Sequence, residues 1–281
     1  MNICVFLALL GILSVSCKEK ISSTYKSKMS LFRPYIDRTT GRLPFGEMKG
    51  DCNVVSIGGD AGVHLTSSRE GSSGSISSKH PLEMRNWKMD VHMQIKPGAK
   101  GAAIWIMKDF EAGDLFGGSS TFNGMMIFLA LEKNNLTNSY PSIGIATAYG
   151  GAPVVHFEKK ISFVKDSLIS LNFWNGTLSV SYGGRDKKVN LVDELSRLTV
   201  DDGSFITVSG EIKEAFGDIS VKTISLFRLY TSNKKSYSQY DPPKTRSLMT
   251  WVIFVILIGA VGYYLYKQRS SKPKHKGILQ Q

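Results

Sequence analysis

The sequence predicts an all-β protein, a two-sheet sandwich, with one membrane-spanning helix near its C-terminus. Between residues 53 and 230, short apolar runs alternate with glycine-rich breaks, which is the pattern of many short strands. No amphipathic helical stretch of convincing length interrupts that pattern. Near the C-terminus, nineteen successive residues carry no charge. About 180 residues of strands in one unit are enough for two layers that bury alternate side chains between them.

Ten segments fit the strand pattern, because each combines β-branched, aromatic or other apolar residues with flanking glycine or polar breaks. Asn175-Gly176 separates two of these segments and favours a type I′ hairpin turn, since both central residues of that turn need a positive φ. The predicted strands span residues 53–56, 74–77, 88–95, 101–107, 125–131, 142–147, 168–173, 177–182, 205–209 and 221–229.

The first sixteen residues have the character of a secretory signal peptide. They carry no charged side chain, and their apolar run, residues 3–13, is too short to span a bilayer as a helix. Ser14 and Ser16 provide the small residues expected at positions −3 and −1 of a cleavage site. We therefore expect residues 1–17 to form a signal peptide, with a buried N-terminal strand as the alternative.

Residues 248–266 predict a transmembrane helix. At 1.5 Å per residue they reach roughly 28 Å, close to the ~30 Å thickness of the hydrocarbon core. Trp251 lies near one end and three tyrosines lie near the other, as an interfacial aromatic belt requires. Five basic residues and no acid follow, so the positive-inside rule makes residues 267–281 a basic cytosolic tail. Residues 231–247 then form a short stalk below a lumenal domain.

The net charge of +12 raises the question of a nucleic-acid partner. Five of the 35 basic residues belong to the tail, where they orient the span and meet anionic lipid. The rest of the chain contains no basic block with interleaved aromatic residues, so nucleic-acid binding is excluded. Three cysteines are too few for a disulfide scaffold. Cys52 is expected to be a buried free thiol, with a disulfide to Cys17 or to another chain as the alternative.

A series of short motifs occurs in a fixed order between residues 30 and 230. The series includes RNWKMDV at 85–91, GAAIW at 101–105, FNGMMIF at 122–128 and DISV at 218–221. In this order and spacing the motifs resemble the L-type, leguminous-lectin-like domain of intracellular cargo lectins of the early secretory pathway. The chain is identified as a divergent member of that family, and the resemblance covers nearly the whole lumenal part.

The resemblance implies a jelly-roll sandwich of one flat and one curved sheet. It also implies that the partner is glycoprotein cargo, whose high-mannose glycans bind on a concave face through loops organised by calcium. A type I protein of this family carries cargo between endoplasmic reticulum and Golgi, with coat components meeting its cytosolic tail. The implied location is therefore a membrane of the endoplasmic reticulum, the Golgi or the compartment between them.

Mapped residue by residue, the resemblance assigns three residues to carbohydrate binding. Ser120 stands where the family has an aspartate before the Phe-Asn-Gly run, so it offers a hydroxyl in place of a carboxylate. Asn134 matches the family's asparagine and can both donate and accept hydrogen bonds. His156 matches the family's histidine and supplies one ring nitrogen.

The metal-binding aspartates of the family are missing. Ala130 stands at the first position and cannot ligate a metal through its side chain, and Lys159 stands at the second, where its charge repels calcium. Glu158 is adjacent but would need a shifted loop. Residues 211–216 (EIKEAF) stand where the family has its late Gly-Gly-Leu sugar loop. Calcium is thus implied by the resemblance alone, and the residues predict a degraded site to which we assign no metal ligand.

Two functions remain open. The first is a type I membrane, lectin-like cargo receptor that binds the high-mannose glycans of glycoproteins for transport from endoplasmic reticulum to Golgi. The second is a protein-interaction or structural membrane protein that keeps the lectin fold and has lost calcium-dependent sugar binding.

An enzyme is not expected. A glycosidase is a weaker third option, but its acids need rigid neighbouring positions, whereas Asp109, Glu111 and Asp114 lie in a glycine-containing loop. Asn135 and Asn175 begin N-glycosylation sequons in predicted loops.

Overall fold

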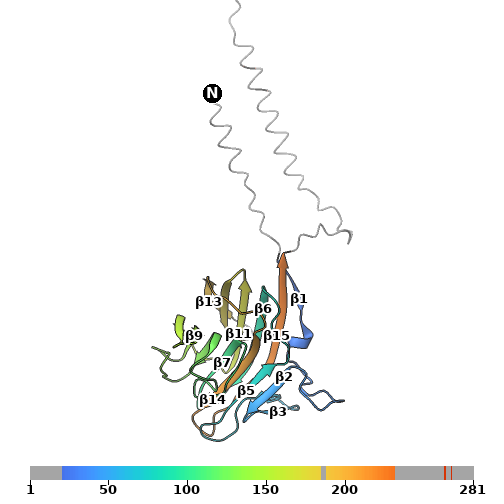
Figure 1. Cartoon of the computed structure of the whole chain (residues 1–281), viewed down its shortest axis with the longest axis vertical. Helices are drawn as coiled ribbons and strands as arrows, with labels where there is room; N and C mark the ends of the chain where they lie inside the picture. The colour runs from blue at the N-terminus through green and yellow to red at the C-terminus, as the bar shows by residue number, and fades with distance from the viewer. Residues whose placement is uncertain (1–20, 185–187, 232–262, 264–266, 268–281) are drawn as a thin grey trace, which may run out of the picture. The chain divides into compact units, whose positions relative to one another are not determined.

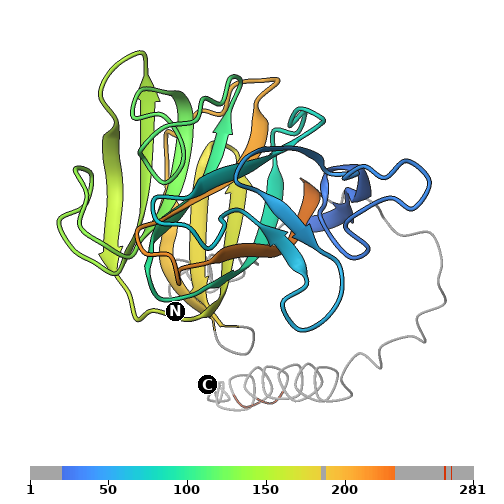
Figure 2. The same cartoon turned by 90° about the horizontal axis from the view of Figure 1, so that it is seen from below.

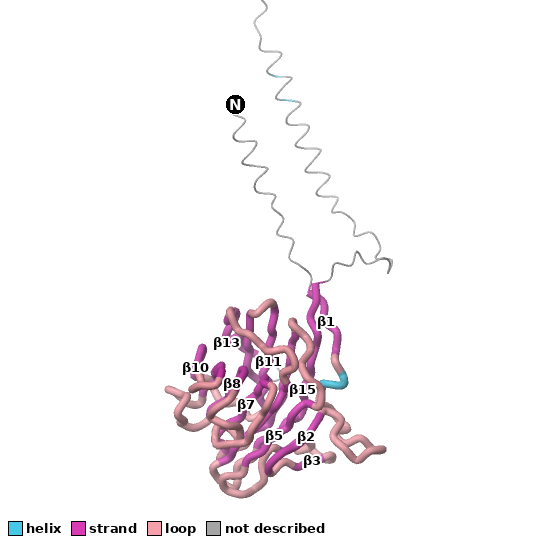
Figure 3. Tube along the Cα trace, viewed as in Figure 1, coloured by secondary structure: helices cyan, strands magenta, loops and turns pink. Residues whose placement is uncertain are grey.

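The computed structural model describes residues 21–184 and 188–231, together with Tyr263 and Lys267. Residues 21–231 belong to one compact unit, a sandwich of two antiparallel sheets (Figures 1 and 3). Apart from Thr231 and those two single residues, the predicted signal peptide, stalk, membrane-spanning helix and tail lie outside the described residues. No helix in the part that is described is long and apolar enough to cross a membrane.

Sheet A has eight strands, and its central strand β15 pairs with three others. β15 runs between β6 on one side and β4 and β1 on the other. The sheet continues from β6 through β11 and β12 to β13, and from β4 to β3. Its strands are β1 (Ile21–Tyr25), β3 (Asn53–Val55), β4 (Gly62–His64), β6 (Trp87–Ile95), β11 (Asp166–Trp174), β12 (Thr177–Gly183), β13 (Lys188–Leu195) and β15 (Ile219–Thr231). The 3-10 turn η1 (Ser27–Met29) follows β1.

Sheet B has seven strands in the order β10-β9-β8-β7-β14-β5-β2. Every neighbouring pair among them is antiparallel, and β14 joins the two halves by pairing with β7 and β5. The strands are β2 (Gly46–Gly50), β5 (Ser73–Ser78), β7 (Ala99–Met107), β8 (Asn123–Ala130), β9 (Ser142–Tyr149), β10 (Val154–Lys160) and β14 (Phe205–Ile212).

The main core fills the space between the two layers, which face each other in Figure 2. Strand β6 shows how the sequence creates this arrangement, because its side chains alternate between the two faces of sheet A. Trp87, Met89 and Val91 are fully buried, whereas Lys88 and Asp90 between them are partly exposed. The same alternation predicts a half-buried strand from sequence, and it identifies the outer face of sheet A as polar.

All ten predicted strands are present, with ends shifted by a few residues. The predicted type I′ turn is also confirmed, since Asn175 has φ 50° and Gly176 has φ 76°. Five further strands carry too weak a pattern to be predicted. β2, β10 and β13 are sheet edges, where exposed residues blur the alternation, and β1 is short and largely exposed. β4 contains only three residues.

Cys52 is a free thiol in the structure, as expected, but it is only partly buried. Its Sγ lies 3.2 Å from the carbonyl oxygens of both Lys49 and Ser75. Burial raises the pKa of the thiol to about 11, so it is neither ionised nor nucleophilic near neutral pH. Cys17, its alternative partner, lies outside the described residues.

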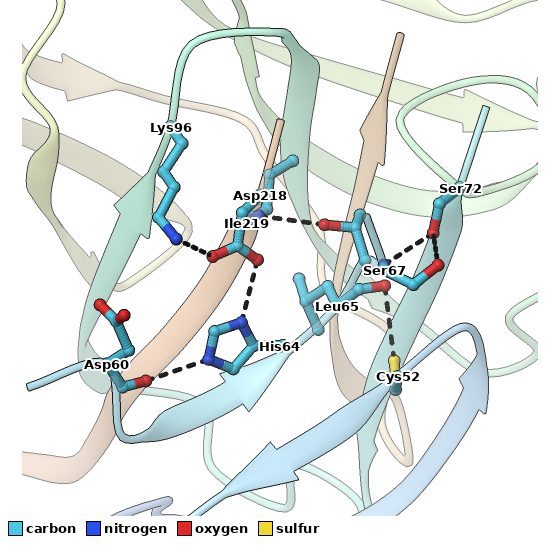
Figure 4. Close-up of polar contacts among 10 residues, drawn as sticks. Cys52, Asp60, His64, Leu65, Ser67, Ser72, Lys96, Asp218 and Ile219 are labelled. Atoms are coloured by element: carbon cyan, nitrogen blue, oxygen red, sulfur yellow. Dashed lines mark hydrogen bonds and ion pairs between the residues drawn. The ribbon is translucent and has the colours of Figure 1, made fainter. Parts of the chain in front are cut away.

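An ion pair joins β4 to the start of β15. His64 Nδ1 lies 2.9 Å from Asp218 Oδ1, and His64 Nε2 lies 3.0 Å from the carbonyl oxygen of Asp60 (Figure 4). Both partners are acceptors, so the ring satisfies both only when it is doubly protonated. The hydrogen bond to Asp218 accordingly raises the pKa of His64, against the opposing effect of burial. Lys96 Nζ binds the second carboxylate oxygen of Asp218 at 3.1 Å.

His64→Gln should therefore destabilise the protein in a pH-dependent way. Because the pKa of His64 is higher in the folded state than in the unfolded state, protonation of His64 stabilises the fold. This stabilisation is complete below the unfolded-state pKa of about 6.5 and is lost as the pH rises through the folded-state pKa. We expect the variant to lose about 1–3 kcal/mol of unfolding free energy near pH 5.5 and clearly less near pH 9. Urea unfolding at a series of pH values measures this difference. Asp218→Asn should remove most of the same pH dependence, and a constant difference would contradict this account.

Candidate functional site

The outer face of sheet B is apolar around Trp105 on β7. The 108–122 loop between β7 and β8 covers this face and brings Phe122 against the tryptophan, with 5.1 Å between ring centroids in an edge-to-face arrangement. Gly118 lets the loop approach closely, because a β-carbon there would lie 2.4 Å from the Trp105 ring. The loop is therefore packed onto the sheet by a second apolar cluster.

A chain of two buried hydrogen bonds fixes the same loop. Trp105 Nε1 donates to Ser209 Oγ at 2.7 Å, and the Ser209 hydroxyl donates to the carbonyl oxygen of Phe116 at 2.6 Å. The Phe116 ring stacks on Phe128 of β8 with 5.8 Å between centroids. Loop, β7, β8 and β14 are thus held together as one rigid group at this end of sheet B.

A small cavity of about 140 Å³ opens where the 108–122 loop meets the ends of β7, β8 and β14. Its polar lining comes from two lysines, three acids and one asparagine: Lys100, Lys133, Asp114, Glu132, Glu211 and Asn134. Lys100 forms an ion pair with Glu211, whose side chain is almost fully buried. Lys213 Nζ lies 3.4 Å from a carboxylate oxygen of Glu132.

Asn134 lines this cavity and carries an unused hydrogen-bond donor. Its Oδ1 accepts a hydrogen bond from the backbone N–H of Leu136 at 2.8 Å, which fixes the orientation of the amide. Its Nδ2 is buried and has no hydrogen-bond partner among the described residues. Leaving a buried donor unsatisfied costs about 1–3 kcal/mol, and a ligand oxygen in the cavity would recover that cost.

The structure does not bring the three predicted carbohydrate residues together. Asn134 lines the cavity, but Ser120 is exposed on the 108–122 loop and does not. His156 is exposed on β10, at a bulge opposite β9, where its Nε2 lies 2.7 Å from Thr147 Oγ1. No hydrogen bond or ion pair within the described part of the chain links any two of the three.

The positions that hold the family's metal ligands have other roles here. Ala130 is fully buried in the apolar cluster on the outer face of sheet B, and Lys159 is exposed near the end of β10. Glu158 does not take over as a ligand. Its carboxylate accepts hydrogen bonds from the backbone N–H groups of Asn138 and Ser139, both at 3.1 Å.

Glu158 therefore ties the 131–141 loop to β10. Burial works to raise the pKa of Glu158, but the hydrogen bonds from the Asn138 and Ser139 amides outweigh burial and hold the pKa below its usual range. The charged form of the carboxylate is thus the one that the loop stabilises.

These residues do not fit a calcium ion. Calcium takes six to eight oxygen ligands, and the carboxylates of Glu211, Glu132 and Glu158 are engaged by lysines or by backbone amides. Within residues 21–184 and 188–231, no group of three or more histidine, cysteine, aspartate or glutamate side chains is placed to hold a metal ion.

Sequence reasoning missed Lys100, Glu132 and Glu211 as members of the site. Lys100 and Glu211 are 111 residues apart, and they meet only because β14 pairs with β7, with Glu211 opposite Gly101. Glu211 is the first residue of the EIKEAF segment, which stands in place of the family's sugar loop, but nothing in that segment points to Lys100 as its partner. Only the pairing register between β7 and β14, which sets Glu211 beside Lys100, would have identified this ion pair from sequence.

The fold agrees with a family model. The model of the legume-like lectin family matches residues 22–196, which is more than half of the chain. The chain belongs to the legume-like lectin family. The predicted family and the predicted sandwich fold are both confirmed. This family consists of lectins and not of enzymes, and Asp109, Glu111 and Asp114 are exposed residues of a surface loop.

Several members of the family are similar to this chain. Human vesicular integral-membrane protein VIP36 is 24% identical over 323 residues, which covers 95% of this chain and 89% of VIP36. The crystal structure of the VIP36 exoplasmic/lumenal domain in its Ca2+/Man-bound form has a TM-score of 0.65 and 21% identity, covering 73% of this chain and 91% of that one. A legume lectin-like domain from Entamoeba histolytica has a TM-score of 0.59 and 15% identity. The match covers 73% of this chain and 99% of the Entamoeba domain.

Glu158→Gln should loosen the 131–141 loop, because a neutral amide oxygen is a weaker acceptor than a carboxylate. We expect the amide protons of Asn138 and Ser139 to exchange about tenfold faster, a change of ~1.4 kcal/mol, in hydrogen-exchange mass spectrometry of the full chain. In the wild type, this protection should persist down to about pH 4 and be lost on further acidification. The pKa of Glu158 is lower in the folded state than in the unfolded state, so its charge stabilises the loop until the pH falls through the folded-state pKa.

Glu47→Gln, at an exposed position on β2, is the matched control and should leave the exchange of this loop unchanged. Equal exchange in the wild type and in Glu158→Gln would show that the carboxylate does not hold the loop.

Proposed function

We propose that this chain is a membrane-anchored, lectin-like cargo receptor of the early secretory pathway. Residues 1–17 direct the chain into the lumen, residues 248–266 anchor it in the membrane, and residues 267–281 reach the cytosol and contact coat components. Membership of the legume-like lectin family supports this proposal. So does the alignment over 95% of the chain with VIP36, a vesicular integral-membrane protein.

The ligand we propose is a mannose-containing glycan on a glycoprotein, bound at the cavity beside Asn134. The observation that carries this assignment is the buried Nδ2 of Asn134, a donor without a partner in the described structure, on a residue that lines a polar cavity. The VIP36 lumenal domain is known with mannose and with Man3GlcNAc, which supports the ligand class.

In this assignment each polar group has a defined role. Asn134 Nδ2 donates to a sugar hydroxyl oxygen, and the exposed carboxylate of Asp114 accepts from a sugar hydroxyl. The Lys100–Glu211 ion pair holds the cavity wall, and Glu158 holds the adjoining loop. Because the residues do not fit calcium, binding proceeds without a metal ion.

A second function, a glycan-independent protein-interaction domain, is favoured by one observation. Ala130 and Lys159 remove the side chains that the family uses for its metal, and Glu158 is committed to the 131–141 loop. A scaffold that retains its fold but lacks that chemistry can bind clients through protein contacts alone.

Asn134→Ala should weaken glycan binding, because it removes the donor that the ligand satisfies. We expect the full chain in detergent to bind mannose-rich glycans on an array equally well with calcium and with a chelator. The variant should bind at least about tenfold more weakly, equivalent to ~1.4 kcal/mol. Asn190→Ala, at an exposed position on β13 of the other sheet, is the control and should bind normally.

Absence of glycan binding in both conditions would refute the sugar-binding role. In that case, capture of clients that persists after their deglycosylation would establish the second function. Binding that appears only with calcium would show that the metal-independent site is wrong.

We also propose that Asn135 and Asn175 carry N-linked glycans, since both are exposed in turns. Endoglycosidase treatment of the full chain should increase its gel mobility. Asn135→Gln and Asn175→Gln should each remove one step of that shift. Because sequons are modified only in the lumen, an unchanged mobility would also count against the proposed topology.

A further inference from the structure

A second, larger cavity of about 930 Å³ lies against the outer, polar face of sheet A. Gln94 of β6, Asp166 of β11 and Lys222 of β15 contribute to its lining, together with Arg33 and Lys165 from connecting segments. The lining thus includes three cationic side chains and one carboxylate. Its volume is within the range of small-molecule binding sites.

Lys222 is the central feature of this cavity. It sits at a bulge of β15, where the register against β6 shifts between Val221 and Thr223, and a bulge re-aims the side chain that it carries. Only 8% of Lys222 is exposed, and its Nζ is buried with no hydrogen-bond partner among the described residues. A buried ammonium without a partner is costly, and such groups are normally paired.

Neither of the two acids of the 58–61 turn and the start of β15 contacts Lys222. Asp218 binds His64 through one carboxylate oxygen and Lys96 through the other, as Figure 4 shows. Asp60 offers its backbone carbonyl to His64 and makes no hydrogen bond to Lys222. The cation therefore has acidic neighbours but no counter-ion in contact.

The surrounding chain holds Lys222 and the cavity wall in place. Tyr35 is buried and its hydroxyl donates to the carbonyl oxygen of Lys222 at 2.9 Å. Arg33 Nη2 lies 3.4 Å from the carbonyl oxygens of both Gly58 and Ala61, so it closes the 58–61 turn against the cavity. These contacts join three separate segments, residues 33–35, residues 58–61 and β15, so the cavity wall does not depend on one flexible side chain.

Gln94 adds a second unsatisfied group. Its Oε1 is buried and accepts no hydrogen bond within the described structure. Gln94 lies on the outer face of β6, opposite Asp166 of β11 in the strand register, and lines the same cavity as Lys222. A ligand that complements both groups needs an anionic part for the ammonium and a hydroxyl donor for the amide oxygen.

We propose that this cavity binds a phosphate ester of a small polyol, with the oxyanion on Lys222 and Arg33 and a hydroxyl group donating to Gln94 Oε1. Phosphate suits a site with several cationic donors, because its oxygens accept from more than one of them. The cavity lies on the opposite sheet from Asn134, so the two sites are independent.

The electrostatics of Lys222 agree with this assignment. Burial lowers the pKa of its ammonium, and the charge of Arg33 lowers it further, whereas Asp60, Asp218 and Asp166 act in the opposite direction. A bound dianion would stabilise the charged ammonium and would also relieve its repulsion from Arg33.

The test uses three probes on the full chain in detergent: glucose 6-phosphate, inorganic phosphate and glucose. We expect glucose 6-phosphate to raise the melting temperature and to bind in calorimetry more tightly than inorganic phosphate, while glucose has no effect. Equal binding of phosphate and glucose 6-phosphate would refute the hydroxyl contact to Gln94. No binding of either anion would overturn the proposal.

Lys222→Met keeps the length and apolar stem of the side chain while removing its charge. Without ligand, the variant should be at least as stable as the wild type, because an unpaired buried cation is removed. With glucose 6-phosphate, it should lose the stabilisation, with affinity reduced at least about tenfold. Arg33→Gln, at an exposed position, is a second variant that should also weaken binding of glucose 6-phosphate.

Lys49→Met, at an exposed site on β2, and Asn134→Ala should both leave glucose 6-phosphate binding unchanged. Undiminished affinity in Lys222→Met and Arg33→Gln would place the anion elsewhere and refute the assignment. Asn134→Ala should affect glycan binding but not glucose 6-phosphate binding, so the two proposals can fail independently of each other.

Discussion

The packing of Trp105 beneath the 108–122 loop is the interaction on which the loop end of sheet B depends. Its ring is fully buried, contacts Phe122 from the loop, and is linked by its Nε1 through Ser209 to the backbone of Phe116. Sheet B is consequently buried on both faces here. The 108–122 loop thereby becomes a fixed wall of the cavity beside Asn134, and the position of Asp114 in that wall follows from this packing.

The same end of the sheet shows how a divalent cation can be dispensed with in organising loops. A metal gathers distant carboxylates by neutralising their charge. Here the ammonium of Lys100 neutralises Glu211, and hydrogen bonds from the backbone amides of Asn138 and Ser139 stabilise the charge of Glu158. Both arrangements satisfy a carboxylate within the chain, so the loops gain order from intramolecular hydrogen bonds. The cavity that remains is polar and carries charges of both signs.

Much of the fold could be predicted from sequence, because alternation with period two reports which face of a strand is buried. This alternation predicts the central strands β6 and β15. The Asn175-Gly176 turn is predicted by its local sequence alone, because both residues tolerate a positive φ. The edge strands β10 and β13 could not be predicted, since one neighbour and an exposed face leave little pattern.

The sites were harder to predict than the strands. The family resemblance assigned Asn134 but could not show that its Nδ2 has no hydrogen-bond partner among the described residues. Lys100 with Glu211 and Lys222 with Gln94 are brought together by pairing between strands that are remote in sequence. The bulge that turns Lys222 toward its cavity leaves no trace in composition, because it is a shift in register between two strands.

The pairing of Ile21 with Thr231 has a mechanical consequence. The first and last described strands of the sandwich, β1 and β15, run antiparallel, so both ends of the domain leave it at the same point. Near that point β15 is flanked by β1 on one side and β6 on the other. Tension applied along the C-terminal end of β15 must therefore shear two rows of backbone hydrogen bonds together and cannot peel them apart one at a time. The two rows of hydrogen bonds resist such a load together, so the sandwich should withstand a pull along β15 better than a single strand pairing would.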